Sequence, residues 1–378
     1  MSRGGGSGLT VGMNCRVLAK PTRTGVGRYT GRLLESLAAR AERDAATYTL
    51  FGVGPDDPDC EFDRGGFDAV RDAGEPAWAH SGVRAHLWEQ FELPRLCPRY
   101  DLDVLHTPAG NPPVLGSVPL VTTIHDISPV VHPEWFATGY ATLYRAVTPL
   151  AVRRSAAVIT VSEFSASELA DVYPSAAGKI RAVHNGVTPP PPGTPPAGVS
   201  PSAEFLLFVG SVNPRKNVEG LLTAYRRYRE SADRPAKLLL AGAENDVFAT
   251  PKMPSVDGAH ALGYVDDAEL GWLYRNARAL VFPSKYEGFG LPILEAMSVG
   301  TPVVTSDRGA MAEVAGDAAC LVDADDPGAI AAGMERVDAD PEYRETLARA
   351  GRERAEEFTW ERTAERTAAV YRDVADGG

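Results

Sequence analysis

The sequence predicts an α/β protein with two doubly wound domains, each built around a parallel sheet. The chain has 378 residues, which is more than a single hydrophobic core usually supports. A proline-rich stretch over residues 188–202 divides it into halves of similar size, and such a stretch behaves as a stiff extended linker. Within each half, short apolar runs alternate with helical patterns, which favours parallel sheets made of βαβ units.

Nine apolar runs of strand length are predicted as strands, and ligands are expected at their carboxyl ends. Phe205–Val209 is apolar throughout, which is typical of a strand in a sheet covered on both faces. In the first half the strands are Leu9–Cys15, Tyr48–Val53, Val104–His106, Leu120–Ile124 and Val158–Val161. In the second half they are Phe205–Gly210, Lys237–Ala241, Ala279–Phe282 and Val303–Thr305.

Composition narrows the class of protein. Hydrophobic residues make up 44% and charged residues 23% of the chain, as in globular proteins. The net charge of −12 argues against a nucleic-acid partner, which needs a basic face. The four cysteines are scattered without a C-x-x-C pair, so neither a disulfide framework nor a zinc site is expected, and a reducing cytoplasm fits. No run approaches the length of a membrane span, and the glycine-rich start is expected to be a disordered lead-in rather than a signal peptide.

Glu287 and Glu295 lie eight residues apart in the most informative stretch, where a predicted strand ends and a helix begins near Leu291. A loop that leads into a helix N-terminus offers unpaired N–H groups and a positive dipole end to an anion. Gly288 and Gly290 allow the backbone to approach a ligand closely. The two carboxylates could accept hydrogen bonds from hydroxyls on either side of a bound phosphate, as in a nucleotide sugar. An ordinary pair of surface glutamates is the other interpretation.

Arg215 and Lys216 form the matching turn of the second half, between the strand Phe205–Val209 and a helix from Val218. Two positive charges at a helix start oppose the helix dipole. An anion is therefore expected to compensate them, and a diphosphate would do so. A solvated pair is the other interpretation.

Gly25 and Gly27 follow the first strand and open a helix. Their spacing is G-x-G-x-x-x-G rather than the dinucleotide fingerprint G-x-G-x-x-G, so the motif alone is weak evidence. We interpret the two glycines as letting the chain approach a diphosphate or an acceptor. A loop that needs positive φ is the alternative.

His125 ends a first-half strand, where a side chain faces the ligand edge of the sheet. His106 ends the strand before it and is weaker evidence, because a lone histidine is more often structural. Asp126 precedes Ser-Pro and also fits a turn or a helix cap. Ser162 and Glu163 are predicted to cap a helix.

The segment Glu287–Met297, with Gly-Thr-Pro-Val-Val behind it, closely resembles the Glu-x7-Glu signature of the retaining glycosyltransferases of family 4. The resemblance runs from Gly25 to the last helix. It implies the GT-B fold, in which two Rossmann-like domains face an interdomain cleft. It also implies that a hexose moves from a nucleoside-diphosphate sugar to a hydroxyl acceptor with retention of configuration. The similarity is greatest to mannosyl- and rhamnosyltransferases of surface polysaccharide or glycan synthesis.

The resemblance also implies roles for individual residues. Glu295 would bind the ribose hydroxyls and Glu287 the sugar hydroxyls, while Lys216 binds phosphate. Many relatives have an arginine where this chain has Ser211, and Arg215 is expected to replace it. His125 would lie near the donor sugar and its leaving group. The remaining donor-binding residues are Gly288, Phe289, Gly290, Leu291, Gly25 and Gly27, with the backbone of Tyr264 and Val265 reading the base.

No cofactor and no metal is expected. The letters Asp101-Leu-Asp103 match a D-x-D metal motif but precede their strand. In the resembled family the departing phosphate is thought to take the acceptor proton.

The resemblance predicts four segments: a first, acceptor-side domain over 1–188, a linker over 189–204, a nucleotide-sugar domain over 205–357, and a last helix over 358–378 that crosses back to the first domain. A last helix packed on its own domain is the alternative. A sugar-nucleotide epimerase, a phosphorylase, which would need a cofactor lysine that cannot be identified here, and a non-catalytic sugar-nucleotide-binding subunit remain alternative functions.

Residues 135–154 combine aromatic and aliphatic residues with three arginines, a composition that suits anionic lipid head groups. A lipid-linked acceptor, and a cytoplasmic protein peripheral at the inner face of the cell membrane, are therefore further expectations. The other interpretation is a core helix, interrupted by Pro149, with a solvated face.

Overall fold

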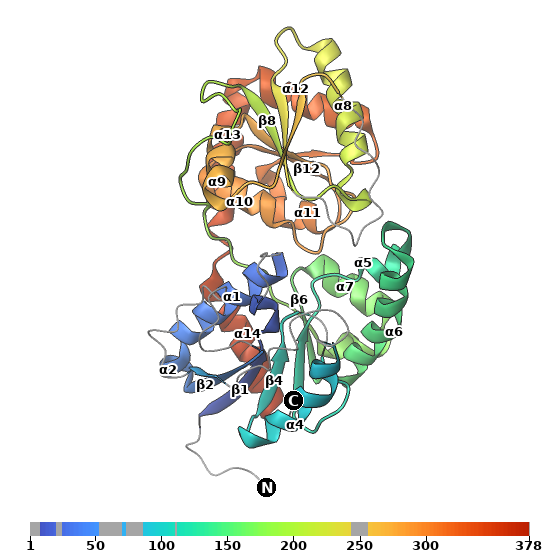
Figure 1. Cartoon of the computed structure of the whole chain (residues 1–378). Coiled ribbons are helices and arrows are strands. Elements are labelled where there is room, and N and C mark those ends of the chain that lie inside the picture. Colours follow the sequence, from blue (N-terminus) through green and yellow to red (C-terminus); the bar gives the residue numbers. More distant parts are fainter. Residues whose placement is uncertain are drawn as a thin grey trace. The chain divides into compact units, whose positions relative to one another are not determined.

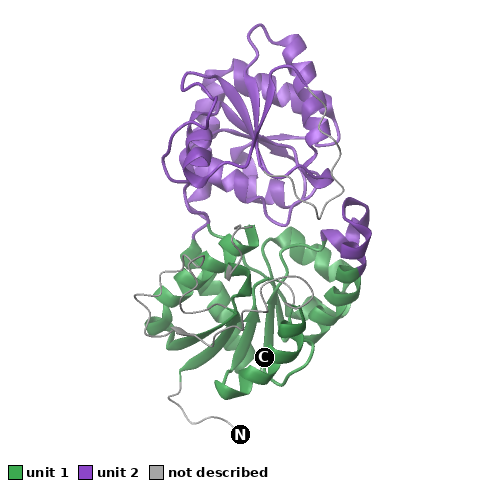
Figure 2. Ribbon diagram, in the orientation of Figure 1, with its two compact units in different colours: residues 1–127, 143–186, 360–378 green, residues 128–142, 187–359 purple. Residues whose placement is uncertain are grey.

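The computed structural model describes residues 8–19, 25–52, 70–72, 86–109, 112–242 and 256–377. They form two compact units, which Figure 2 colours separately. Unit 1 comprises Met1–Ile127, Leu143–Gly186 and Trp360–Gly378, and unit 2 comprises Ser128–Thr142 and Val187–Thr359. Each unit contains one parallel sheet with helices packed against it. The predicted α/β fold with two doubly wound sheets is confirmed.

The sheet of unit 1 has seven strands in the order β3-β2-β1-β4-β5-β6-β7, and every neighbouring pair is parallel. The strands are β1 (Leu9–Asn14), β2 (Ala46–Phe51), β3 (Val70–Asp72), β4 (Val104–Thr107), β5 (Leu120–Thr123), β6 (Ala157–Thr160) and β7 (Ile180–Ala182). The helices of this unit include α1 (Gly25–Ala39), α2 (Ala41–Asp44), α4 (Leu93–Leu96), α7 (Glu163–Val172) and α14 (Trp360–Ala375), and α6 (Thr138–Arg154) enters it from Leu143 onward.

The sheet of unit 2 has six parallel strands in the order β10-β9-β8-β11-β12-β13. They are β8 (Phe205–Val209), β9 (Lys237–Ala241), β10 (Ala259–Gly263), β11 (Ala279–Phe282), β12 (Val303–Ser306) and β13 (Cys320–Val322). In Figure 1, α8 (Val218–Ser231) and α12 (Pro327–Ala339) cover one face, and α9 (Asp267–Asn276) and α10 (Leu291–Val299) cover the other. The elements α5 (Ser128–Val131), η7 (Pro214–Lys216), α11 (Gly309–Ala315) and α13 (Pro341–Ala355) complete the part of this unit used below.

All nine predicted strands are present, with no end displaced by more than two residues. They are the interior strands of the two sheets. The described strands that the sequence did not predict are the four edge strands β3, β7, β10 and β13. Three of these four have only three residues, and no residue of β7 or β10 is fully buried. Edge strands are covered less than interior ones, so they lack the apolar run that predicts a strand.

Helix α14, the last of the chain, belongs to unit 1. It packs against α1 and against β1, β4 and β6. Trp360 at its start contacts the Tyr29 ring, with centroids 6.1 Å apart, and Thr363 donates a hydrogen bond to the His184 carbonyl. The first and last parts of the chain therefore share one core.

The proline-rich stretch has no regular secondary structure. It belongs to unit 2, where the carbonyls of Pro190 and Pro191 accept hydrogen bonds from the Arg275 side chain of α9. The described cysteines Cys15, Cys97 and Cys320 are buried. Over the described ranges, no helix is long and apolar enough to cross a membrane.

Candidate functional site

The strands of the two sheets follow the same order, except that the unit 1 sheet has one more strand, β7. In each sheet the direction in which successive strands are added reverses at one point. In unit 2 this point lies between β8 and β11, which are neighbours in the sheet but not in the sequence. Ligands of doubly wound sheets bind outside the carboxyl ends of the strands at such a point. The turn after β8 carries Lys216, and the loop after β11 carries Glu287. The sheet order therefore places both predicted side chains at the favoured position.

Lys216 and Glu287 contact each other directly. Lys216 Nζ lies 2.6 Å from Glu287 Oε1, and each side chain is only 9% exposed. The contact is an ion pair without hydrogen-bond geometry at that oxygen. The ammonium also lies 4.4 Å from the centre of the Phe282 ring. Burying both charges costs several kcal/mol of desolvation per ion, so this pair is weak evidence for stability and better evidence for a site that handles charge.

Gly210 makes room for the lysine stem. Its φ of +143° lies in a region that other residues rarely adopt. A Cβ there would approach Lys216 Cε to 3.3 Å. The sheet end and the lysine therefore fit together because residue 210 is a glycine.

The turn that carries Lys216 is fixed by two asparagines. Asn213 caps η7 by accepting a hydrogen bond from the Lys216 N–H. Asn217 is left-handed, with φ 56°, and its buried side chain donates to the carbonyls of Pro283 and Ala324. Asn217 thereby joins the turn after β8 to the loops after β11 and β13. Asn217 was not predicted as a site residue, because its role depends on partners 66 and 107 residues away.

Arg215 lies between these two asparagines and is half-buried. Its carbonyl accepts a hydrogen bond from the Lys285 N–H at 2.7 Å. This bond couples the turn to the loop that carries Glu287.

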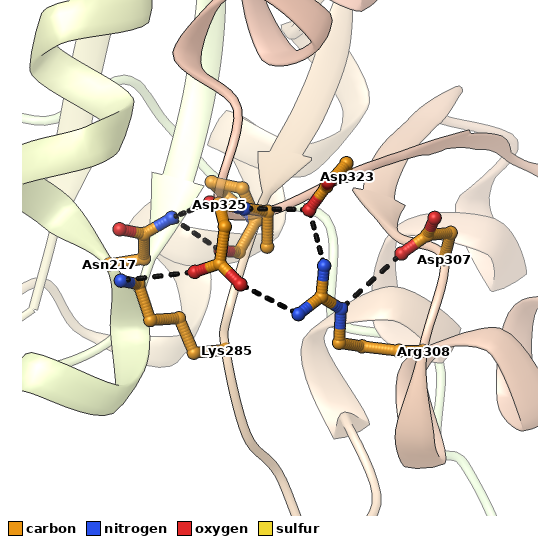
Figure 3. A network of polar contacts seen from close by, with 8 residues as sticks. Asn217, Lys285, Asp307, Arg308, Asp323 and Asp325 are labelled. Carbon is orange, nitrogen blue, oxygen red and sulfur yellow. Dashed lines mark hydrogen bonds and ion pairs between the residues drawn. The ribbon is translucent and has the colours of Figure 1, made fainter.

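A charged network surrounds Lys285, as Figure 3 shows together with Asn217. Arg308, after β12, pairs with Asp325 at 2.7 Å and with Asp323, and Lys285 pairs with Asp325 at 3.2 Å. Hydrogen bonds from Lys285 and then Arg308 lower the pKa of Asp325. These side chains are about half exposed, so each pair contributes little stability. Together they connect the loops that follow β11, β12 and β13.

One of the two predicted glycines in the loop that ends at α10 has a positive φ. Gly290 precedes the helix with φ +99°, a conformation that favours glycine. Gly288 and Phe289 are buried, and the Phe289 ring packs edge-on against Phe358 at 5.9 Å. Leu291 is the first residue of the helix. The N-terminus of α10, which is the positive end of its dipole, therefore follows Glu287 in the loop after β11.

Glu295 is half-buried inside α10 and has a different partner from Glu287. The Tyr274 hydroxyl of α9 donates a hydrogen bond to Glu295 Oε2 at 2.8 Å. The Tyr274 side chain is fully buried. It was not predicted as a site residue, because an aromatic residue in an amphipathic helix is typical of a core position. The tyrosine fixes the orientation of the carboxylate.

In unit 1, His125 follows β5. Its Nε2 lies 2.9 Å from the Pro108 carbonyl oxygen. A carbonyl can only accept, so Nε2 carries the proton, and in the neutral ring Nδ1 is an acceptor. Burial lowers the pKa of His125, which favours the neutral ring. Its backbone carbonyl accepts from the Ser165 hydroxyl at 3.4 Å.

His106 is fully buried, and both of its ring nitrogens contact hydroxyl groups of unit 1. It is therefore part of the core. Asp126 is half-buried beside His125, and Ser162 caps α7 by accepting from the Ser165 N–H at 3.1 Å, as predicted. Glu163 is the first residue of that helix.

Gly25 and Gly27 are the first and third residues of α1. Neither has positive φ, so the alternative of a loop that needs positive φ is wrong. Tyr264 and Val265 lie between β10 and the helix cap Asp266. The Tyr264 side chain is 73% exposed, and the predicted use of its backbone stays a prediction.

Asp101 and Asp103 lie before β4, at the edge opposite the carboxyl ends. Asp103 accepts a hydrogen bond from the Thr10 N–H at 2.9 Å. Among the described residues, no three His, Cys, Asp or Glu side chains form a group that could hold a metal.

Comparisons with known proteins agree with this geometry. Residues 23–189 match Glycosyltransferase Family 4, and residues 196–354 match Glycosyl transferases group 1. The chain is 34% identical over 265 residues to O-antigen chain mannosyltransferase B of Escherichia coli, covering 67% of this chain and 70% of that protein. The fold resembles sucrose-phosphate synthase of Thermosynechococcus elongatus with a TM-score of 0.69, at 22% identity, over 98% of this chain and all of the other. It also resembles an Anabaena protein solved with UDP and glucose, with a TM-score of 0.65 at 17% identity, over 96% and 99% of the two chains. The chain therefore belongs to the group 1 and family 4 glycosyltransferases, enzymes of the GT-B fold that transfer a hexose from a nucleotide sugar.

Proposed function

We propose that this glycosyltransferase retains the anomeric configuration of a nucleoside-diphosphate hexose, and that the diphosphate binds at the carboxyl edge of the unit 2 sheet. The observation that carries the proposal is the buried Lys216–Glu287 ion pair at the point where the strand order reverses. A buried ion pair is costly, and a diphosphate would give Lys216 a second anionic partner. Glu287 would then be available to accept hydrogen bonds from sugar hydroxyls.

The leaving diphosphate gains charge as the glycosidic bond breaks. Lys216, Arg215 and the amides from Gly288 to Leu291 are positive groups fixed in position before the reaction. Preorganised charge of this kind is commonly the largest catalytic contribution. In this proposal the phosphate accepts the acceptor proton, and no metal and no cofactor is required.

The other predicted site residues also have roles in this proposal. Glu295 binds the ribose hydroxyls in the orientation that Tyr274 sets. The unprotonated Nδ1 of His125 accepts a hydrogen bond from a hydroxyl of the reacting sugars. A Cβ at Gly25 would meet no atom within 4 Å, which supports the proposed approach of substrate to the start of α1 at Gly25 and Gly27. The Tyr264–Val265 backbone reads the base.

The similarity to an O-antigen mannosyltransferase supports mannose as the first sugar to test. It also supports a lipid-linked glycan as the class of acceptor.

A feature of unit 1 supports contact with a membrane. Leu143 and Leu150 of α6 are 45% and 51% exposed. They lie two turns apart on one face, and the exposed Arg153 is three residues after Leu150. Exposed leucines next to an arginine suit an anionic lipid surface.

Two details of α6 differ from the sequence expectation. Pro149 lies inside α6, which continues to Arg154, so the expected interruption is wrong. Arg154 donates hydrogen bonds to the carbonyls of Gly116 and Val118, so it holds a loop rather than joining a lipid-facing surface. Co-sedimentation with anionic vesicles tests the membrane contact. It should fall in Leu143→Ser/Leu150→Ser, and equal recovery of variant and wild type in the supernatant at low salt would refute it.

The donor is tested with a panel of GDP-, UDP-, dTDP- and ADP-hexoses. Thermal shift identifies the base, and release of nucleoside diphosphate with a methyl mannoside or a lipid-linked mannoside as acceptor measures turnover. Transfer to an acceptor by the purified chain supports the proposal. Interconversion of the donor sugar without transfer would favour the epimerase, and binding without turnover would favour a non-catalytic subunit.

A further inference from the structure

A chain of buried hydrogen bonds crosses unit 1. The Tyr371 hydroxyl lies 2.6 Å from His106 Nδ1, and His106 Nε2 lies 2.8 Å from Thr123 Oγ1. The same Thr123 oxygen lies 3.3 Å from the Tyr29 hydroxyl. None of the four side chains is more than 1% exposed. They come from α14, β4, β5 and α1, and the first bond joins residues 265 positions apart.

His106 gives this series of hydrogen bonds a defined donor-to-acceptor direction. Burial, and to a smaller extent the neighbouring His125, lowers the pKa of His106 to about 3, so its ring is neutral at ordinary pH. A neutral imidazole has one donor and one acceptor nitrogen. The hydroxyls of Tyr371 and Thr123 must therefore use opposite roles toward it, and a change at one end alters what the other end can bond.

This series of hydrogen bonds ends at Tyr29, which packs against His125. The Tyr29 ring stands edge-on to the His125 imidazole, with centroids 4.7 Å apart and planes at 90°. Within the described part of the chain, the His125 side chain makes one hydrogen bond, from Nε2 to the Pro108 carbonyl. A single hydrogen bond leaves the ring free to tilt about it, so the packed Tyr29 ring fixes the direction of Nδ1.

We propose that Tyr371, His106 and Thr123 are positioning residues, which orient His125 through the ring of Tyr29 and so make its placement depend on the C-terminal helix. The inference rests on the proposed role of His125 in sugar transfer. Four buried polar groups in one chain are costly unless all are bonded, and a fully bonded network specifies one arrangement. A purely apolar core could hold α14 on unit 1 equally well, but it would not fix which way each ring faces.

The first experiment compares two buried tyrosines of unit 1. Tyr371→Phe removes the hydroxyl that bonds His106. Tyr48→Phe is the matched control, since Tyr48 is also fully buried but its hydroxyl has no hydrogen-bond partner among the residues that the structure describes. The readout is the nitrogen NMR titration of His125 in histidine-labelled protein, assigned with His125→Ala. Asp126 and His106 are the titratable groups that act on His125, and neither residue is substituted in these two variants.

We expect Tyr371→Phe to move the His125 titration midpoint by about half a pH unit or more, because its burial changes. Tyr48→Phe should leave it in place. Transfer by Tyr371→Phe should show a kcat at least about fivefold lower, with donor KM within about twofold. Thr123→Val, which breaks the chain in the middle, should act similarly, and the double variant should be no worse than either single variant.

An unchanged His125 titration in Tyr371→Phe, or equal effects of Tyr371→Phe and Tyr48→Phe, would overturn the inference. Additive losses in the Tyr371→Phe/Thr123→Val variant would also overturn it. The proposed function fails separately. If His125→Ala transfers at the normal rate, the assigned role of His125 is wrong, whatever the NMR experiment shows.

Discussion

The two units have the same sheet order around the strand reversal but build different chemistry there. In unit 2, a lysine and a glutamate face each other as charges, Lys216 after β8 and Glu287 after β11. In unit 1, Arg16 after β1 pairs with the buried Glu89 at 3.0 Å. His106 and His125, at the ends of β4 and β5, contact hydroxyls, a carbonyl and the Tyr29 ring. In our proposal the unit 2 pair serves an anion, and His125 serves a hydroxyl group.

The units also differ in how their side chains are brought together. The residues around Glu287 belong to loops of the unit 2 sheet, and the link from Asn217 to the Ala324 carbonyl spans 107 residues. In our proposal the residues around His125 depend on Tyr371, which is 265 residues from its partner His106. The unit 1 arrangement should therefore be sensitive to its C-terminal helix.

The charge in unit 2 makes the strongest prediction. Lys216→Met should lower kcat about 100- to 1,000-fold, because the lysine acts on charge that grows in the transition state. It should also destabilise the fold by about 3–5 kcal/mol, since Glu287 becomes a buried unpaired charge. Adding Glu287→Gln should restore the melting temperature without restoring turnover.

Lys285→Ala is the control for this experiment. Lys285 is a half-exposed lysine close by, whose ion pair with Asp325 is worth about 0–1 kcal/mol. Near-normal rates are expected for it. Turnover that recovers together with stability in the Lys216→Met/Glu287→Gln variant would show that the pair is only structural.

Nucleotide binding should depend on Glu295 in unit 2. Glu295→Ala should weaken nucleoside-diphosphate binding by about 1.5–3 kcal/mol, because the ribose hydroxyls lose a charged partner. Tyr274→Phe, which removes only the orienting hydrogen bond, should cost less. Calorimetry measures both affinities, and an unchanged affinity in Glu295→Ala would remove the residue from the site.

Acid should weaken unit 1 more than unit 2. The pKa of His106 falls from 6.5 to about 3 on folding, so between these values the unfolded chain binds a proton that the folded chain does not. Stability should therefore fall by about 1.4 kcal/mol per pH unit as pH drops through that window, and His106 should contribute no slope above it. The described histidines of unit 2, His132 and His260, are not buried.

Hydrogen exchange can follow each unit separately. Protection of β4 and β5 should fall with pH more steeply than that of β11 and β12. In His106→Asn the difference should shrink, even though the variant is less stable overall. Equal slopes in the two units of the wild type would contradict the assignment.

Chelation should have the smallest effect. With Lys216, Arg215 and the α10 N-terminus as counter-charges, turnover should survive EDTA unchanged. Loss of turnover on EDTA treatment, with recovery on adding manganese, would show that the diphosphate needs a metal.

The sequence predicted the interior of each sheet and identified Lys216 and Glu287 individually, but not the contact between them, and it failed at the edges and at long range. Interior strands such as β8 and β11 are covered on both faces, so they appear as continuous apolar runs. Edge strands such as β7 and β10 are partly exposed and lack that run. Asn217, Tyr274 and Tyr371 could not be predicted as site residues, because each acts on a partner that only the fold brings near.

The configuration of the transferred sugar tests the central claim most directly. The first-formed product can be followed by NMR while the enzyme uses a donor identified by the nucleotide panel, starting with GDP-α-D-mannose. Retention predicts an α-linked product as the first species, with turnover abolished in the Lys216→Met/Glu287→Gln variant. A β-linked first product would contradict the account, because the acceptor would then have attacked from the face opposite the diphosphate, where the departing phosphate could not take its proton.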